Sequence, residues 1–176
     1  MKSQTRQAKL KETILLTLMG VIMYISQVTL SQLPNIELVS LLVIITTRRF
    51  GLKALCSIYI FVVCEVFTYG AELWVINYMY VWTVLCVISL VFKKLDNSLI
   101  FAFLSAIFGL CFGTLCSVPY FFVGGAAMGF SYIVAGLWFD IVHSIGNFVL
   151  TLLLYKPLTK ALDNVINKYI YINCQW

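Results

Sequence analysis

A few carboxylate, imidazole and amide side chains interrupt the long apolar stretches of this sequence. Asp140, His143 and Asn147 follow one another at intervals of three and four residues, so they share one face of a helix. Glu65 lies in another apolar stretch. A carboxylate inside a membrane span is costly and usually faces a cavity or a partner. These side chains are therefore candidates for a binding site, although hydrogen bonds between helices would explain the stripe equally well.

The composition is that of a membrane protein. Of the 176 residues, 62% are hydrophobic and 11% are charged, whereas a soluble domain carries about 25% charged residues. The 12 Lys and Arg residues lie between the apolar runs, which argues against nucleic-acid binding. Six cysteines without a C-x-x-C pair and a single histidine favour neither a disulfide framework nor a metal site. We expect no metal and no cofactor.

Six apolar runs predict an all-α fold, a single membrane domain over residues 1–176. The shortest run has 11 residues and covers only about 16 Å, as a short tilted helix or a re-entrant segment would. The runs are 12–30, 37–47, 52–69, 74–92, 99–118 and 126–155.

The distribution of positive charge favours six crossings. With the N-terminus inside, six crossings place all 12 Lys and Arg residues on the inner side, as the positive-inside rule requires. If 37–47 did not cross, Arg48, Arg49 and Lys53 would face outward. We therefore predict a multi-pass protein of the cell membrane with both termini in the cytoplasm.

This topology places the polar residues of several runs at a similar depth. Glu65 lies about 6 Å from the outer end of its run, and Asp140 lies about 22 Å above the inner end of its own, in a core of about 30 Å. Trp74, Asn77 and Tyr78 lie at the outer end of the run 74–92. Taken singly, Trp74 and Tyr78 are typical of interfacial aromatic residues. Together, these groups predict a pocket that opens outward and binds a small molecule.

The sequence carries no motif of a familiar enzyme class. It has no G-x-S-x-G, no H-E-x-x-H and no P-loop, so the chain cannot hydrolyse ATP alone. Asp140 and His143 could form an acid/base pair acting on lipid, but no nucleophile or phosphate clamp lies nearby. We expect a protein that is not an enzyme.

Three segments carry a family resemblance. They are Leu-Pro-Asn-Ile-Glu at 33–37, Gly-Leu-Trp-Phe-Asp-Ile-Val-His-Ser-Ile-Gly-Asn-Phe at 136–148 and Tyr-Lys-Pro-Leu at 155–158. With six predicted spans in a short chain, the sequence resembles the substrate-binding S-components of energy-coupling factor (ECF) transporters. The resemblance covers essentially the whole chain.

The resemblance implies a six-helix bundle in a bacterial cell membrane that captures a vitamin or a related micronutrient from outside. It implies two kinds of partner, a transmembrane coupling subunit and two cytoplasmic ATPases that drive uptake. It also implies a ligand near the outer face, among the last three helices and the outer loops. The expected ligand contacts are Asn35, Glu65, Trp74, Asn77, Tyr78, Asp140, His143 and Asn147.

Small residues predict close contacts between helices. Gly109-x-x-x-Gly113 and Gly125-x-x-x-Gly129 allow two helices to approach. Many members of the family dock on the coupling subunit through Ala-x-x-x-Ala on the first span, and the nearest equivalent here is Thr13-x-x-x-Thr17. We expect Thr13 and Thr17 at that docking face.

The outer half of the predicted bundle holds carboxylates and few basic groups. This favours a neutral or cationic ligand over an anion, and thiamine-like, pyridoxine-like, nucleobase-like, riboflavin-like and corrinoid ligands remain open. The alternative is a self-contained proton- or ion-coupled transporter, in which Glu65, Asp140 and His143 form a proton relay.

Overall fold

The computed structural model describes the backbone of residues 2–171 and the side chains of residues 6–170. Within this part of the chain every regular element is helical, which confirms the predicted all-α fold. A 3₁₀ turn, η1 (Gly51–Lys53), joins α2 to α3, and a π-helical turn, η2 (Asn167–Tyr171), follows α6. The α-helices are α1 (Lys2–Leu30), α2 (Val39–Phe50), α3 (Ala54–Tyr69), α4 (Leu73–Val91), α5 (Ser98–Cys116) and α6 (Val118–Ile166).

Five stretches of helix in the described residues are long and apolar enough to cross a membrane, which indicates a membrane-embedded protein. α2 does not reach that length alone and is counted with α3 in one stretch, Val39–Tyr69. The six crossings and the cytoplasmic termini expected from the charge pattern therefore stay predictions.

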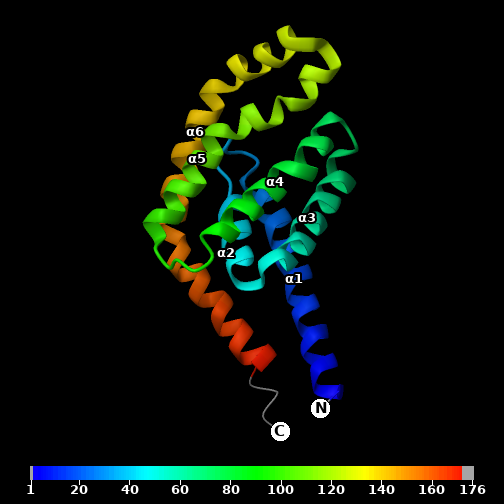
Figure 1. Cartoon of the computed structure of the whole chain (residues 1–176), viewed down its shortest axis with the longest axis vertical. Helices are drawn as coiled ribbons and strands as arrows, with labels where there is room; N and C mark the ends of the chain where they lie inside the picture. The colour runs from blue at the N-terminus through cyan, green and yellow to red at the C-terminus, as the bar shows by residue number, and fades with distance from the viewer. Residues whose placement is uncertain (1, 172–176) are drawn as a thin grey trace.

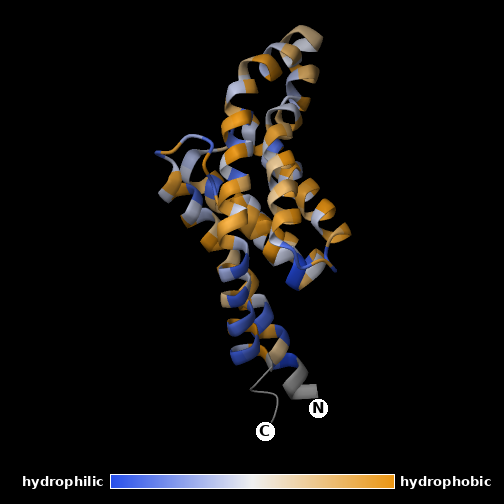
Figure 2. Ribbon diagram, turned by 90° about the vertical axis from the view of Figure 1, so that its left-hand side faces the viewer, coloured by the Kyte–Doolittle hydropathy of each residue, from blue (hydrophilic) through white to orange (hydrophobic). Residues whose placement is uncertain are grey.

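α5 and α6 form a long antiparallel hairpin beside the other four helices (Figure 1). The hairpin projects beyond the other helices at one end of the molecule, while the start of α1 and the end of α6 lie at the opposite end. Hydrophilic residues gather at this second end (Figure 2). The molecule is thus polarised along its length.

A pair of glycines makes the turn of this hairpin. Gly124 (φ −127°, ψ 15°) and Gly125 (φ 70°, ψ −168°) interrupt α6 with non-helical backbone angles. The positive φ of Gly125 is a conformation that glycine adopts without steric cost. The sequence predicted the last run at 126–155, but the helix continues through Pro157 to Ile166, and this end buries one face at Thr159, Leu162 and Ile166.

α2 is the central helix of the bundle. It contacts α1, α3, α4, α5 and α6, and every residue from Val39 to Arg48 is buried. A helix segment that is apolar on all sides is expected to be buried in protein or in a membrane. The continuous apolar run from Leu41 to Ile45 is explained by this position.

Two glycines of α5 bring it close to α6. A Cβ atom on Gly109 would lie 3.0 Å from the backbone of His143 and Ser144, and one on Gly113 would lie 2.5 Å from Oδ2 of Asp140. The Gly109-x-x-x-Gly113 motif thus faces α6 and allows the two backbones to approach.

Replacing Gly109 by alanine is expected to push α5 away from α6. Gly109→Ala should lower the free energy of unfolding by about 1–3 kcal/mol, the usual effect of overpacking, measured by unfolding of the purified protein in detergent. Gly136→Ala is the matched control, since nothing lies within 4 Å of the added Cβ. Equal stability of the two variants would show that the α5–α6 contact is not tight.

Candidate ligand-binding site

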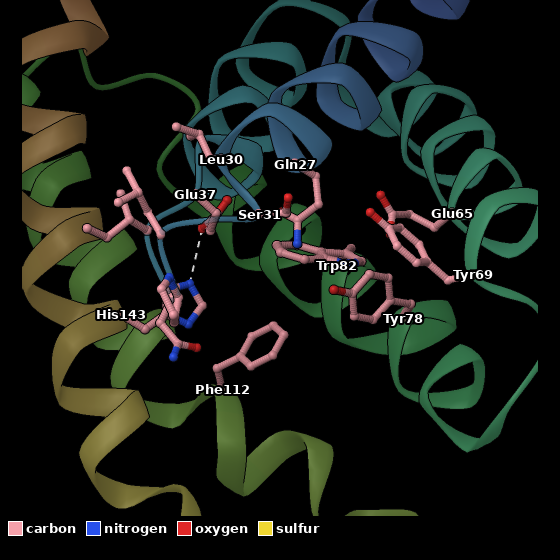
Figure 3. Close-up of a pocket in the computed structure, with 14 residues that line it drawn as sticks. Gln27, Leu30, Ser31, Glu37, Glu65, Tyr69, Tyr78, Trp82, Phe112 and His143 are labelled. Carbon is pink, nitrogen blue, oxygen red and sulfur yellow. Dashed lines mark hydrogen bonds and ion pairs between the residues drawn. The ribbon is translucent and has the colours of Figure 1, made fainter.

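A cavity of about 320 Å³ lies where the α1–α2 connection meets α3, α4, α5 and α6 (Figure 3). α1 and α3 end here and α2 and α4 begin here, so the cavity lies at the end of these four helices opposite to the start of α1. Its volume is within the range of small-molecule sites, roughly 300–1,000 Å³. Its walls are formed by Gln27, Leu30, Ser31, Leu33, Pro34, Asn35, Ile36, Glu37, Glu65, Tyr69, Tyr78, Trp82, Phe112 and His143.

The connection between α1 and α2 forms one wall. Asn35 has a positive φ of 60°, a conformation that asparagine tolerates better than most residues. Glu37 anchors the end of the connection, because its Oε2 accepts a hydrogen bond of 2.8 Å from the backbone N–H of Ser40. Its Oε1 is hydrogen-bonded to Nε2 of His143 on α6, at 3.1 Å. Glu37 therefore fixes the connection both to the start of α2 and to α6.

Aromatic rings form the opposite wall in a continuous series. The ring centroids are 5.6 Å apart for Tyr78 and Trp82, 5.7 Å for Trp82 and Phe112, and 5.0 Å for Phe112 and His143. Tyr78 and Trp82 are one helical turn apart on α4, which places both on the cavity side of that helix. Neighbouring rings are tilted or edge-on to one another, with interplanar angles of 88°, 51° and 68°, so the wall offers a ligand both ring faces and ring edges.

Four buried polar atoms in this cavity have no hydrogen-bond partner among the described residues. They are Oε1 of Gln27, Oε1 of Glu65, Nε1 of Trp82 and Nδ1 of His143. Buried polar groups in native proteins are nearly always hydrogen-bonded. All four belong to side chains of the cavity lining, which makes these side chains candidates for contacts with a bound molecule.

Half of the ligand contacts expected from the sequence line this cavity. Asn35, Glu65, Tyr78 and His143 come together here although they belong to four different segments. Glu65 and His143 are almost completely buried. Glu65 on α3 and His143 on α6 thus lie around the same space, whereas Asp140, which was expected at a similar depth to Glu65, does not line it.

The other two polar residues of the α6 stripe make contacts between helices. Asp140 accepts a hydrogen bond of 2.9 Å from the backbone N–H of Gly113 on α5. Asn147 donates to Oγ of Ser40 at 3.1 Å and to the backbone oxygen of Ser105 at 3.3 Å. Neither residue lines the cavity, so their contacts position α6.

Two residues of α4 lie behind the cavity wall. Asn77 is buried and accepts a hydrogen bond of 3.2 Å from Tyr80. Trp74 packs edge-on against Tyr78, with the ring centroids 5.1 Å apart. Neither belongs to the lining, so Trp74 supports the Tyr78 ring from behind.

Six lining residues that carry polar or aromatic groups were not among the ligand contacts expected from the sequence. Gln27 had a usable signal, since it is a polar side chain within an apolar run. The aromatic lining residues had no distinguishing signal in the sequence, because aromatic residues are common in membrane helices. The six are Gln27, Ser31, Glu37, Tyr69, Trp82 and Phe112.

Thr13 and Thr17 are exposed on α1. Their hydroxyls donate to the backbone oxygens of Lys9 and Thr13, each at 3.0 Å, as threonine does within a helix. Their side chains therefore form a small exposed surface on α1, and their hydroxyl groups are already hydrogen-bonded to the backbone of that helix.

No family model, curated protein or solved structure matches this chain. Among the described residues, no group of three or more His, Cys, Asp or Glu side chains could hold a metal ion. The function must therefore be argued from the cavity itself.

The hydrogen bond between Glu37 and His143 is expected to couple the α1–α2 connection to α6. A double-mutant cycle of Glu37→Ala and His143→Ala should give an interaction energy of about 1–3 kcal/mol, because the pair is buried and in direct contact. The free energies come from unfolding in detergent. The exposed Glu72 supplies the reference pair, and Glu72→Ala with His143→Ala should be additive within about 0.5 kcal/mol. Additivity of the Glu37 pair would contradict a coupling role.

Proposed function

We propose that this protein is the substrate-binding component of an ECF-type transporter in a bacterial cell membrane. It binds a small vitamin-like molecule from the outer side, and a coupling subunit with two ATPases drives the uptake. The observation that carries the proposal is the convergence of four unpartnered polar atoms and an aromatic wall on one ligand-sized cavity.

The packing below the cavity supports a binding protein rather than an open pore. Phe61, Val81 and Leu85 are completely buried. Further toward the hydrophilic end, the buried Arg48 is paired with Asp96 at 3.1 Å and hydrogen-bonded to Tyr155. A ligand in the cavity is therefore separated from the other end by a filled core, and its release requires a rearrangement that a partner can supply.

The hydrogen bonds also favour binding over a proton relay. Asp140 is bonded to the backbone of Gly113, and His143 is bonded to Glu37. Among the hydrogen bonds of the described residues, none joins Asp140, His143 and Glu65 to one another. A relay through these three residues would need a different arrangement of side chains.

Six crossings with both termini in the cytoplasm are part of the proposal. α2 has 12 residues and covers about 18 Å, less than the hydrocarbon thickness. It is enclosed by the other helices, however, and a helix that lipid does not touch need not match the bilayer. The chain can therefore pass through the membrane along α2, with Arg48 and Arg49 at the inner side.

The test of function is uptake with and without partners. The purified protein should be stabilised by one member of a panel of thiamine, pyridoxine, riboflavin and nucleobases in a thermal-shift screen. A ligand at about 100 times its Kd adds about 2.7 kcal/mol. Vesicles that contain this protein alone should bind but not accumulate that compound, and vesicles that also contain a coupling subunit and ATPases should accumulate it when ATP is supplied.

Accumulation by the protein alone under an imposed proton gradient would instead establish a self-contained proton-coupled transporter. Chemical conversion of a lipid or of a panel member, abolished by Asp140→Asn in a folded protein, would establish an enzyme.

The exposed threonines of α1 are expected to contact the coupling subunit. Thr13→Leu with Thr17→Leu should leave ligand binding unchanged and reduce ATP-driven uptake about tenfold, as the loss of about 1.4 kcal/mol of interface energy would. Thr114→Leu, the same change at an exposed threonine of α5, is the control and should retain full uptake. Equal uptake by both variants would remove this face of α1 from the interface.

A further inference from the structure

The cavity carries two acidic side chains, and its one imidazole is bonded to one of them. Glu37 and Glu65 both belong to its lining, and no Lys or Arg is found among the lining residues of the described part of the chain. Both carboxylates are buried, with 7% of Glu37 and 4% of Glu65 exposed. A buried carboxylate needs a partner charge or hydrogen-bond donors, because it has lost its hydration.

The two carboxylates differ in whether the protein satisfies them. Glu37 is held by the N–H of Ser40 and by Nε2 of His143. Oε1 of Glu65 has no partner among the described residues, and Figure 3 shows Glu65 beside Tyr69 on the far side of the cavity from His143. The carboxyl group that the protein leaves without a partner is thus that of Glu65.

The unpartnered oxygens of the lining are hydrogen-bond acceptors. They are Oε1 of Gln27 and Oε1 of Glu65, whereas Nε1–H of Trp82 is a donor. Because an ionised Glu37 can only accept, Nε2 of His143 carries the hydrogen of the bond between them. The two acceptor oxygens favour a ligand with N–H or O–H donors.

The aromatic wall adds a preference for positive charge. The faces of Tyr78, Trp82 and Phe112 carry the negative part of the ring quadrupole, and a cation close to such faces is stabilised. These rings lie in an unbroken series with centroid spacings of 5.6 and 5.7 Å. Flat π-systems also stack against such a wall.

Starting from the proposed function as a ligand-binding protein, we infer that the ligand is a flat organic cation rich in N–H donors. Its positive charge lies at Glu65, its ring lies along Tyr78, Trp82 and Phe112, and its further donors reach Gln27. Aminated or amidine-bearing nitrogen heterocycles have this chemistry. Ligands that carry a carboxylate or a phosphate do not, because no Lys or Arg among the described lining residues would meet them.

Three compounds of the same shape and different charge test this inference. Benzamidinium, benzamide and benzoate share one ring and place a cation, a neutral amide or an anion at the same position. An amidinium also matches a carboxylate through two parallel N–H bonds. We expect benzamidinium to bind the purified protein at least about tenfold more tightly than benzamide, with benzoate weakest, measured by thermal shift across a concentration series.

Glu65→Gln should remove the preference for benzamidinium over benzamide while keeping the shape of the side chain. Glu72→Gln, a carboxylate on the same end of the molecule but outside the lining, should keep it. If Glu65→Gln does not yield a monodisperse protein, Glu65→Asp takes its place. That variant should weaken benzamidinium binding and leave benzamide binding unchanged.

The inference is overturned if benzamide or benzoate binds as tightly as benzamidinium, if none of the three stabilises the folded protein, or if the preference survives Glu65→Gln. These results are separate from the test of function. ATP-driven uptake of a neutral compound would support the proposed transporter function and contradict the proposed cationic ligand. A preference for benzamidinium without partner-dependent uptake would support the cationic ligand and contradict the transporter function.

Discussion

The polar stripe of α6 is the feature on which the arrangement of the other helices depends. In a membrane, a buried polar group without a partner is costly, because no water can replace the missing hydrogen bond. Asp140 is bonded to α5, His143 to the α1–α2 connection, Asn147 to α2 and α5, and Tyr155 to Asp96 between α4 and α5. One face of one helix thus contacts four other segments.

The same constraint leads from packing to the candidate site. The glycines of α5 let α6 come close enough for Asp140 to reach the α5 backbone, and this fixes the height of His143 one turn further on. His143 then uses one ring nitrogen to hold Glu37, while its ring belongs to the cavity lining and its other nitrogen has no partner among the described residues. A structural contact and a binding group are therefore combined in one side chain.

Sequence patterns predicted the helices and the shared face of Asp140, His143 and Asn147, since helical periodicity depends only on spacing. They did not distinguish a residue that contacts a neighbouring helix from one that lines a cavity, because that depends on what the opposite helix places there. Asp140 meets the backbone of Gly113 and Asn147 meets Ser40, whereas Glu65 meets no partner among the described residues. Glu37 was missed for a related reason, as its partner is 106 residues away in the chain.

The short α2 helix accounts for the presence of the cavity. A helix that crossed the hydrocarbon core would need about 20 residues, whereas α2 has 12 and begins only at Val39. Because α2 is enclosed by other helices, the membrane does not impose a length on it. The space beyond its first turn is occupied by the connection at 31–37, which supplies six of the lining residues, Ser31 and Leu33 to Glu37. An irregular backbone within a membrane protein is tolerated where it is covered by protein or faces a cavity, and Glu37 near the end of this connection is the residue that α6 holds in place.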